Sequence, residues 1–254
     1  MMTGTDRWER LGGPLAYAYS AVLLALFLGL AAQSNASTWW QAVCRVELLQ
    51  AVLLTLLTSL ASTVLAILIA VPIAWRLVRR PLPAQAALDV LIDLPLSLSP
   101  LVLGLAFLLF FSSAPGRAIE QVAVACGLPL RGAPAGVVLG QTVIATAFAI
   151  RHLRGAFTSG GPVTPTLGDA LRLRRVPLLV AATITWARTI GEFGPLLLFV
   201  GIVPGRSEVL STAIYLSWTC GDLQGAAAAA SLMVLLSFVV VLLVRRLGVV
   251  RLGP

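Results

Sequence analysis

The sequence has no lysine, a single histidine and three cysteines among its 254 residues. Without lysine it cannot contain a Gly-x-x-x-x-Gly-Lys-[Ser/Thr] phosphate loop, so it carries no ATP-hydrolysing site of that type. His152 has no second histidine, cysteine or carboxylate at ligand spacing, which favours an interfacial role over metal binding or catalysis. The odd number of cysteines argues against a structural disulfide framework.

Charge is also scarce, because charged residues make up 11% of the chain, hydrophobic residues 59%, and the mean hydropathy is +0.97. This balance excludes a soluble single-domain enzyme, and the long apolar blocks exclude a disordered or collagen-like chain. The blocks are about 20 residues long, the length at which a helix crosses a bilayer. The sequence therefore predicts an all-α, polytopic membrane protein with about six transmembrane helices, at 14–33, 48–75, 86–111, 136–150, 176–203 and 223–244.

All 18 basic residues are arginines, and the formal net charge is +8. With the N-terminus in the cytoplasm, thirteen arginines fall in inside segments and four in outside segments, while Arg188 falls within a predicted span. This asymmetry predicts that both termini are cytoplasmic. The arginines are dispersed over separate loops and tails rather than gathered in one stripe, so nucleic acid is excluded as a partner.

The third predicted span contains Pro95 and Pro100, which must cost it backbone hydrogen bonds. We therefore expect a kinked helix that faces the protein interior, where the kink either lines a pathway or only shapes the packing. At the start of the same span, Asp89 and Asp93 form an i,i+4 pair. Without further acidic residues nearby, a role at the cytoplasmic start of the helix is favoured over metal binding.

The fifth predicted span contains two charges in its apolar stretch. Arg188 is followed four residues later by Glu192, which lies in the block Gly191-Glu192-Phe193-Gly194. One helical turn separates the two charges, so they can pair on one face, and the glycines and the following proline permit a break there. Charged groups at this depth are candidates for function. The alternative is an internal or intersubunit ion pair that only fixes helix packing.

These residues resemble the inner-membrane permeases of binding-protein-dependent ABC importers, and most closely the molybdate, tungstate and sulfate branch. The resemblance covers about residues 50–245 and implies a type I permease fold, with 1–254 as a single transmembrane domain. Its strongest stretch begins at Arg188 with the Gly-Glu-Phe-Gly block and continues to Leu223. The other matching stretches are 59–63 with 72–74, and 93–104.

In this family the cytoplasmic loop between the fourth and fifth spans, about 151–176 here, binds the ATPase. It normally holds a Glu-Ala-Ala run, then Leu-Gly, then a basic stretch. The resemblance assigns ATPase coupling to the residues around the Leu-Gly pair, namely Thr166, Leu167, Gly168, Asp169 and Arg172. The Glu-Ala-Ala run is absent, and 160–165 reads Gly-Gly-Pro-Val-Thr-Pro, a helix-breaking sequence. Either the coupling helix is abbreviated, or the subunit engages its ATPase differently or poorly.

The resemblance implies a permease subunit in the cell inner (plasma) membrane that forms the pathway for an oxyanion, molybdate in the first place, with sulfate, tungstate or another small solute as alternatives. Arg188, Gly191, Glu192, Phe193 and Gly194 would form the pathway or its gate. The chain would have no catalytic residue, metal or cofactor of its own. Its implied partners are ATPase subunits that bind ATP, an external solute-binding protein, a second, identical permease subunit and membrane lipid. The competing classes are a multi-pass membrane enzyme, which would need a further acidic or histidine cluster at a membrane face, and a passive channel.

Overall fold

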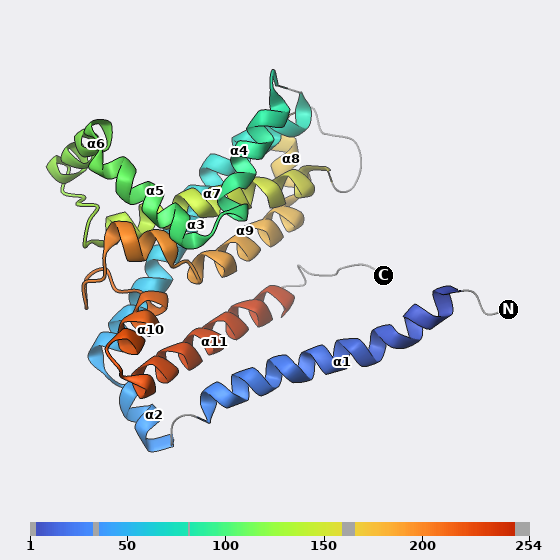
Figure 1. Ribbon diagram of the computed structural model, residues 1–254. Coiled ribbons are helices and arrows are strands. Elements are labelled where there is room, and N and C mark those ends of the chain that lie inside the picture. Colours follow the sequence, from blue (N-terminus) through green and yellow to red (C-terminus); the bar gives the residue numbers. More distant parts are fainter. Residues whose placement is uncertain (1–3, 33–35, 81, 159–165, 247–254) are drawn as a thin grey trace.

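The computed structural model describes residues 4–32, 36–80, 82–158 and 166–246, and every regular element in these ranges is a helix (Figure 1). The prediction of an all-α polytopic membrane protein is confirmed. The helices, in chain order, are α1 (Gly4–Ala31), α2 (Ala36–Val43), α3 (Val46–Arg79), α4 (Gln85–Ser97), α5 (Pro100–Ser112), α6 (Ala114–Ala125), α7 (Pro134–Thr158), α8 (Leu167–Leu173), α9 (Arg175–Ile190), the π-helix η1 (Leu196–Val200), α10 (Leu210–Thr219) and α11 (Leu223–Arg246).

Four of the described helices, α1, α3, α7 and α11, are long and apolar enough to cross a membrane, and α4 with α5 makes a fifth if the bent pair counts as one span. α3 and α7 share the most extensive helix contact. The 25-residue α7 is considerably longer than the span predicted at 136–150, and 61% of the residues in its most apolar stretch are buried. α7 is therefore the central helix, whereas the corresponding stretch of α1 is not buried within the chain at all.

The predicted span at 86–111 is divided into α4 and α5, which meet at an angle of 109°. The break falls at Leu98 and Ser99, directly before Pro100, because proline has no N–H to continue the helix from α4 but suits the first turn of a new one. The Ser99 hydroxyl caps α5 by accepting a hydrogen bond from the Leu101 N–H at 3.3 Å. Pro95 lies inside α4 and does not end it.

The predicted span at 176–203 is likewise not one helix. α9 ends at Ile190, an irregular stretch follows, and the chain then turns into η1. Glycines have low helix propensity and Pro195 lacks an N–H, so the helix ends at the Gly-Glu-Phe-Gly block. α9 alone has 16 residues and falls short of the length of a span. This break and the one between α4 and α5 leave fewer than six continuous spans in the described ranges.

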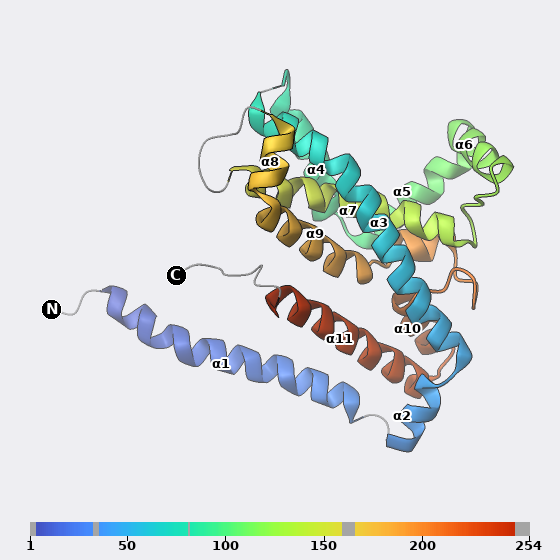
Figure 2. The same cartoon turned by 180° about the vertical axis from the view of Figure 1, so that it is seen from behind.

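Four short helices, α2, α6, α8 and α10, have no counterpart among the predicted spans. Figures 1 and 2 show that α2, α6 and α10 lie toward one end of the long helices, whereas α8 and the described ends of α1 and α11 nearest the chain termini lie toward the other. The molecule therefore has two distinct ends, which are called the α10 end and the α8 end below.

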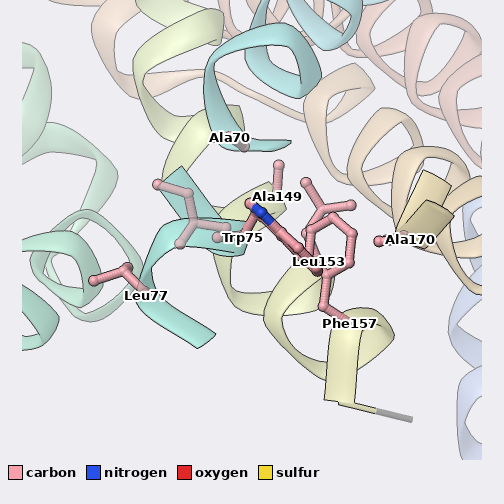
Figure 3. Packing of buried hydrophobic residues seen from close by; sticks show 10 residues of the cluster. Ala70, Trp75, Leu77, Ala149, Leu153, Phe157 and Ala170 are labelled. Carbon is pink, nitrogen blue, oxygen red and sulfur yellow. The ribbon is translucent and has the colours of Figure 1, made fainter. Parts of the chain in front are cut away.

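The core at the α8 end is built from α3, α7, α8 and α9 (Figure 3). Alanines such as Ala70 and Ala149 are fully buried and let the helix backbones approach closely. Trp75 and Phe157 fill the space beside them in an edge-to-face pair with 5.3 Å between ring centroids. Since α8 adds Ala170 to this cluster, its position is fixed by the same core that joins the long helices.

The two helix breaks pack directly against each other. A Cβ atom at Gly194 would overlap the carbonyl group of Pro100, and one at Gly104 would overlap the Gly194 carbonyl and lie 3.2 Å from Leu198 Cβ. Neither position has room for a side chain, because backbone meets backbone there. The junction between α5 and the segment before η1 therefore requires glycine on both sides.

We expect Gly194→Ala to lower the free energy of unfolding by about 3 kcal/mol, since the added methyl group must push the Pro100 backbone away. Heating in detergent, followed by size-exclusion chromatography of the remaining folded protein, measures the change. Gly155→Ala is the matched control, because a Cβ at Gly155 meets nothing within 4 Å and alanine favours helix. Equal melting temperatures for Gly194→Ala and the unaltered protein would show that this junction is not tightly packed.

Candidate translocation and coupling sites

Arg188 and Glu192 form an ion pair at the break that follows α9. The distance from Arg188 Nη1 to Glu192 Oε2 is 2.9 Å. The two side chains differ sharply in exposure, because that of Glu192 is 2% exposed and that of Arg188 is 41% exposed. The carboxylate is therefore enclosed by the chain, whereas the guanidinium lies at its surface.

The backbone of Glu192 is held by its neighbours on both sides. Its N–H donates a hydrogen bond to the Thr189 carbonyl at 3.2 Å, and its carbonyl accepts one from the Ser211 hydroxyl at 2.7 Å. Ser211 lies in the first turn of α10, so this helix holds the break in place. Neither the charge pattern nor the spacing around Glu192 identifies Ser211 as its partner, since the two are 19 residues apart.

The arrangement can offer positive charge to an anion without leaving a bare charge in the membrane. A guanidinium has five N–H donors, and its bond to Glu192 occupies one nitrogen, so its exposed part can still donate. The last turn of a helix also favours a cation. The buried carboxylate offsets the guanidinium charge, which would allow an oxyanion to bind and leave again.

The other residues of the Gly-Glu-Phe-Gly block lie against three different elements. The Phe193 ring lies 5.6 Å from the Tyr215 ring of α10, and a Cβ at Gly191 would be 3.7 Å from Met233 Cε of α11. Gly194 contacts Pro100, as described above. Pro95 lies apart from this junction, in α4, a helix with no fully buried residue.

A row of buried hydroxyls in α3 forms a polar seam with α7 and α9. The Trp186 Nε1–H donates to the Ser59 hydroxyl at 3.1 Å, and the Ser62 hydroxyl donates to Gln141 Oε1 at 3.0 Å. Within the described chain, Gln141 Nε2 has no hydrogen-bond partner. The sequence analysis did not assign these residues to a site, although serine and threonine recur at helical spacing along α3: Thr55, Thr58, Ser59, Ser62 and Thr63.

The predicted coupling residues begin α8. The Thr166 hydroxyl caps this helix by accepting a hydrogen bond from the Asp169 N–H at 3.1 Å. Leu167 packs against the α3–α7 core, whereas Gly168 is exposed and a Cβ there would meet only Thr166 Oγ1, at 3.9 Å. Arg172 is exposed. The Gly-Gly-Pro-Val-Thr-Pro segment at 160–165 lies outside the described residues.

The α8 end carries two further contacts that join the helices. Arg154 of α7 pairs with Asp89 of α4 at 2.6 Å, so this aspartate binds a neighbouring helix. The buried Arg174 donates to the Ala156 carbonyl near the end of α7, at 3.4 Å. Next to it, Leu173 is 74% exposed. An exposed leucine on a helix that is otherwise anchored is a candidate contact for a partner protein.

No three histidine, cysteine or carboxylate side chains in the described ranges gather closely enough to hold a metal ion. The three cysteines, Cys44, Cys126 and Cys220, are exposed and free.

No protein-family model matches the chain. It is similar to the molybdenum transport system permease protein ModB of Mycobacterium tuberculosis, with 31% identity over 255 residues that cover 94% of each chain. ModB of Azotobacter vinelandii is also 31% identical, over 76% of this chain and 90% of the relative. The probable sulfate transport system permease protein cysT of Zygnema circumcarinatum is 26% identical, over 87% of this chain and 83% of the relative. With its helical membrane fold and near full-length matches, the chain belongs to the inner-membrane permeases of ABC importers, in the branch that contains the molybdenum and sulfate permeases.

Proposed function

We propose that two copies of this chain enclose a translocation pathway for an oxyanion, molybdate in the first place, and that separate ATPase subunits drive it. The observation that carries this proposal is the Arg188–Glu192 pair, a partly exposed cation with a buried counter-ion at the broken end of α9. The relatives named as molybdenum permeases support molybdate, and those named as sulfate permeases keep sulfate as the alternative. The chain acts as one transmembrane domain without catalytic residues or a cofactor of its own.

Transport would proceed by alternating access. ATP binding to the partner ATPase subunits stabilises one arrangement of the helices, so that the pathway opens to one side at a time. An external solute-binding protein delivers the oxyanion. The broken helices α4–α5 and α9–η1 meet at the Gly194 junction, where a small shift of either helix would move the neighbouring Arg188–Glu192 pair.

We place the chain in the plasma membrane with both termini and the α8 end in the cytoplasm. The excess of arginine in the segments at this end supports the orientation, since basic residues are retained on the cytoplasmic side. The α10 end then faces outward, toward the solute-binding protein.

Reporter fusions test this orientation. We expect fusions after Arg80 and after Arg175 to report a cytoplasmic location, and a fusion near Arg206 to report an external one, as the arginine distribution requires. Alkaline phosphatase, active outside, and green fluorescent protein, fluorescent inside, give complementary signals. An external signal after Arg80 would overturn the topology.

The pair is tested by comparing Arg188→Lys with Arg188→Met in vesicles that hold equal amounts of folded protein. We expect partial molybdate uptake with lysine, which keeps the charge but loses the planar fork, and almost none with methionine. Uptake of radiolabelled molybdate, with sulfate as competitor, is the measurement.

Removing the arginine also leaves Glu192 buried without its counter-ion, a change that costs about 3–5 kcal/mol and can reduce folded protein by itself. The double variant Arg188→Met with Glu192→Gln separates the two effects, since it removes both charges and keeps the shape of the carboxyl group. A pathway role predicts that this variant assembles and does not transport. Normal uptake by the double variant would refute the pathway role, and the pair would then serve only to fix helix packing.

We further propose that α8 docks on the ATPase. The structure leaves open space around Gly168, so a leucine there should fold within the chain and obstruct only a partner surface. We expect Gly168→Leu to uncouple ATP hydrolysis from molybdate uptake, with wild-type amounts of folded permease. Gly155→Leu, the same change at another exposed glycine with free space around it, is the control. Undiminished, fully coupled uptake in Gly168→Leu would contradict docking at this residue.

A further inference from the structure

A cavity of about 180 Å³ opens at the α10 end, between the first turn of α3, the loop before α10, α10 itself and the start of α11. Arg45, Glu47, Glu208 and Ser217 supply the polar part of its lining. Neither Arg188 nor Glu192 lines it, and nothing in the proposed pathway uses it.

Glu208 is the unusual residue of this cavity. It is only 7% exposed, yet its Oε2 atom has no hydrogen-bond partner among the described residues. Burial raises the pKa of its carboxyl group and the nearby Glu47 carboxylate raises it further, while the Gly205 N–H acts in the opposite direction. A buried carboxylate oxygen without a partner is costly in a folded protein unless something else meets it.

The arginine that lines the cavity, Arg45, is paired with another carboxylate. Arg45 pairs with Asp222 at 2.9 Å, and the Asp222 carboxylate also accepts a hydrogen bond from the Gly225 N–H at 2.8 Å. Glu47 and Glu208 make no ion pair within the described chain. The recess is therefore locally acidic, although the whole chain carries a net charge of +8.

This charge pattern decides what the recess can receive. An oxyanion would be repelled by the two unpaired carboxylates. A metal ion would lack a third protein ligand, because no group of three ligating side chains occurs here among the described residues. A lysine or arginine side chain is attracted by the carboxylates and needs only one or two of them to balance its charge. The cavity has room for its ammonium or guanidinium group.

We propose that this recess is a docking site for a basic side chain of the external solute-binding protein. The inference rests on the proposed function, which places the α10 end outside and assigns delivery of the oxyanion to such a partner. The incoming ammonium or guanidinium group meets Glu208 and Glu47, and Arg45 at the rim stays engaged by Asp222.

Docking at Glu208 would act close to the pathway pair. Directly after Glu208 the chain enters α10, where the Leu210 N–H donates to the Thr55 hydroxyl of α3 at 2.8 Å. One residue later, the Ser211 hydroxyl holds the Glu192 carbonyl. A partner side chain at Glu208 would therefore lie within one helical turn, along the chain, of the hydroxyl that holds the Glu192 backbone carbonyl.

The test uses the complete transporter, permease with its ATPase, in lipid nanodiscs, and the purified solute-binding protein loaded with molybdate. We expect Glu208→Gln to weaken binding of this protein about tenfold, because it removes the charge and keeps the shape. The dependence of Kd on salt should become shallower in the same variant. Stimulation of the ATPase by the binding protein should need a correspondingly higher concentration.

Glu120→Gln is the matched control, because Glu120 pairs with Arg131 in another part of the α10 end and its loss changes the net charge equally. It should leave Kd unchanged. If Glu208→Gln does not assemble, Glu47→Gln takes its place, since Glu47 is exposed in the first turn of α3, and about a threefold weaker Kd is expected.

Unchanged Kd in whichever glutamine variant assembles would overturn the docking site. A loss of permease dimers in Glu208→Gln would also overturn it, because a second copy would then be the occupant. Stabilisation of the unaltered permease by Ca²⁺ or Mg²⁺ alone would overturn it too, because the occupant would then be a metal ion. An unaltered transporter that binds the protein but takes up no oxyanion refutes the proposed function. Normal uptake with binding that is insensitive to Glu208 refutes only the docking site.

Discussion

The contact between the backbones of Gly194 and Pro100 is the constraint on which the arrangement of this protein depends. Two segments of span length are broken, and both breaks would leave backbone groups without helical partners in a membrane. Placing the breaks against each other, with no side chain between them, encloses the irregular backbone within the protein. The same contact fixes the end of α9 and hence the position of the Glu192 carboxylate.

A buried carboxylate at this position has a physical consequence for its partner. Glu192 is enclosed, and hydrogen bonds to Thr189 and Ser211 hold its backbone in place. Arg188 has a long, partly exposed side chain and can turn without losing its counter-ion. An anion would therefore meet a guanidinium that stays beside Glu192 but can change its orientation. Such a cation suits a pathway better than a tight binding site.

Much of this could be predicted from the sequence, because it depends on local rules. Apolar length identified the long helices, and the i,i+4 spacing paired Arg188 with Glu192. Proline and glycine marked the positions of both breaks, although the sequence predicts one span each at 86–111 and 176–203. The sequence did not predict that α9 and η1 are separate helices, with α9 too short to be a span, nor did it predict the short helices at the α10 end. No local pattern brings Ser211 to Glu192 or Gly194 to Pro100, since these contacts join residues 19 and 94 positions apart and arise only from packing.

Both ends of the molecule are packed against the long helices, and this bears on how partners could act on it. At the α8 end, Ala170 and Leu167 pack α8 into the core that joins α3 and α7, so a displacement of α8 would act directly on the packing of these helices. At the α10 end, Val209 and Leu210 are likewise fully buried in core clusters, and the hydrogen bonds of Leu210 and Ser211 add polar links to α3 and to Glu192. Apolar packing therefore couples both ends to the long helices, and at the α10 end polar links also connect the surroundings of Glu208 to Glu192. A change of charge at Glu208 would therefore reach the backbone of Glu192 through the short stretch of chain that leads to the Ser211 hydroxyl.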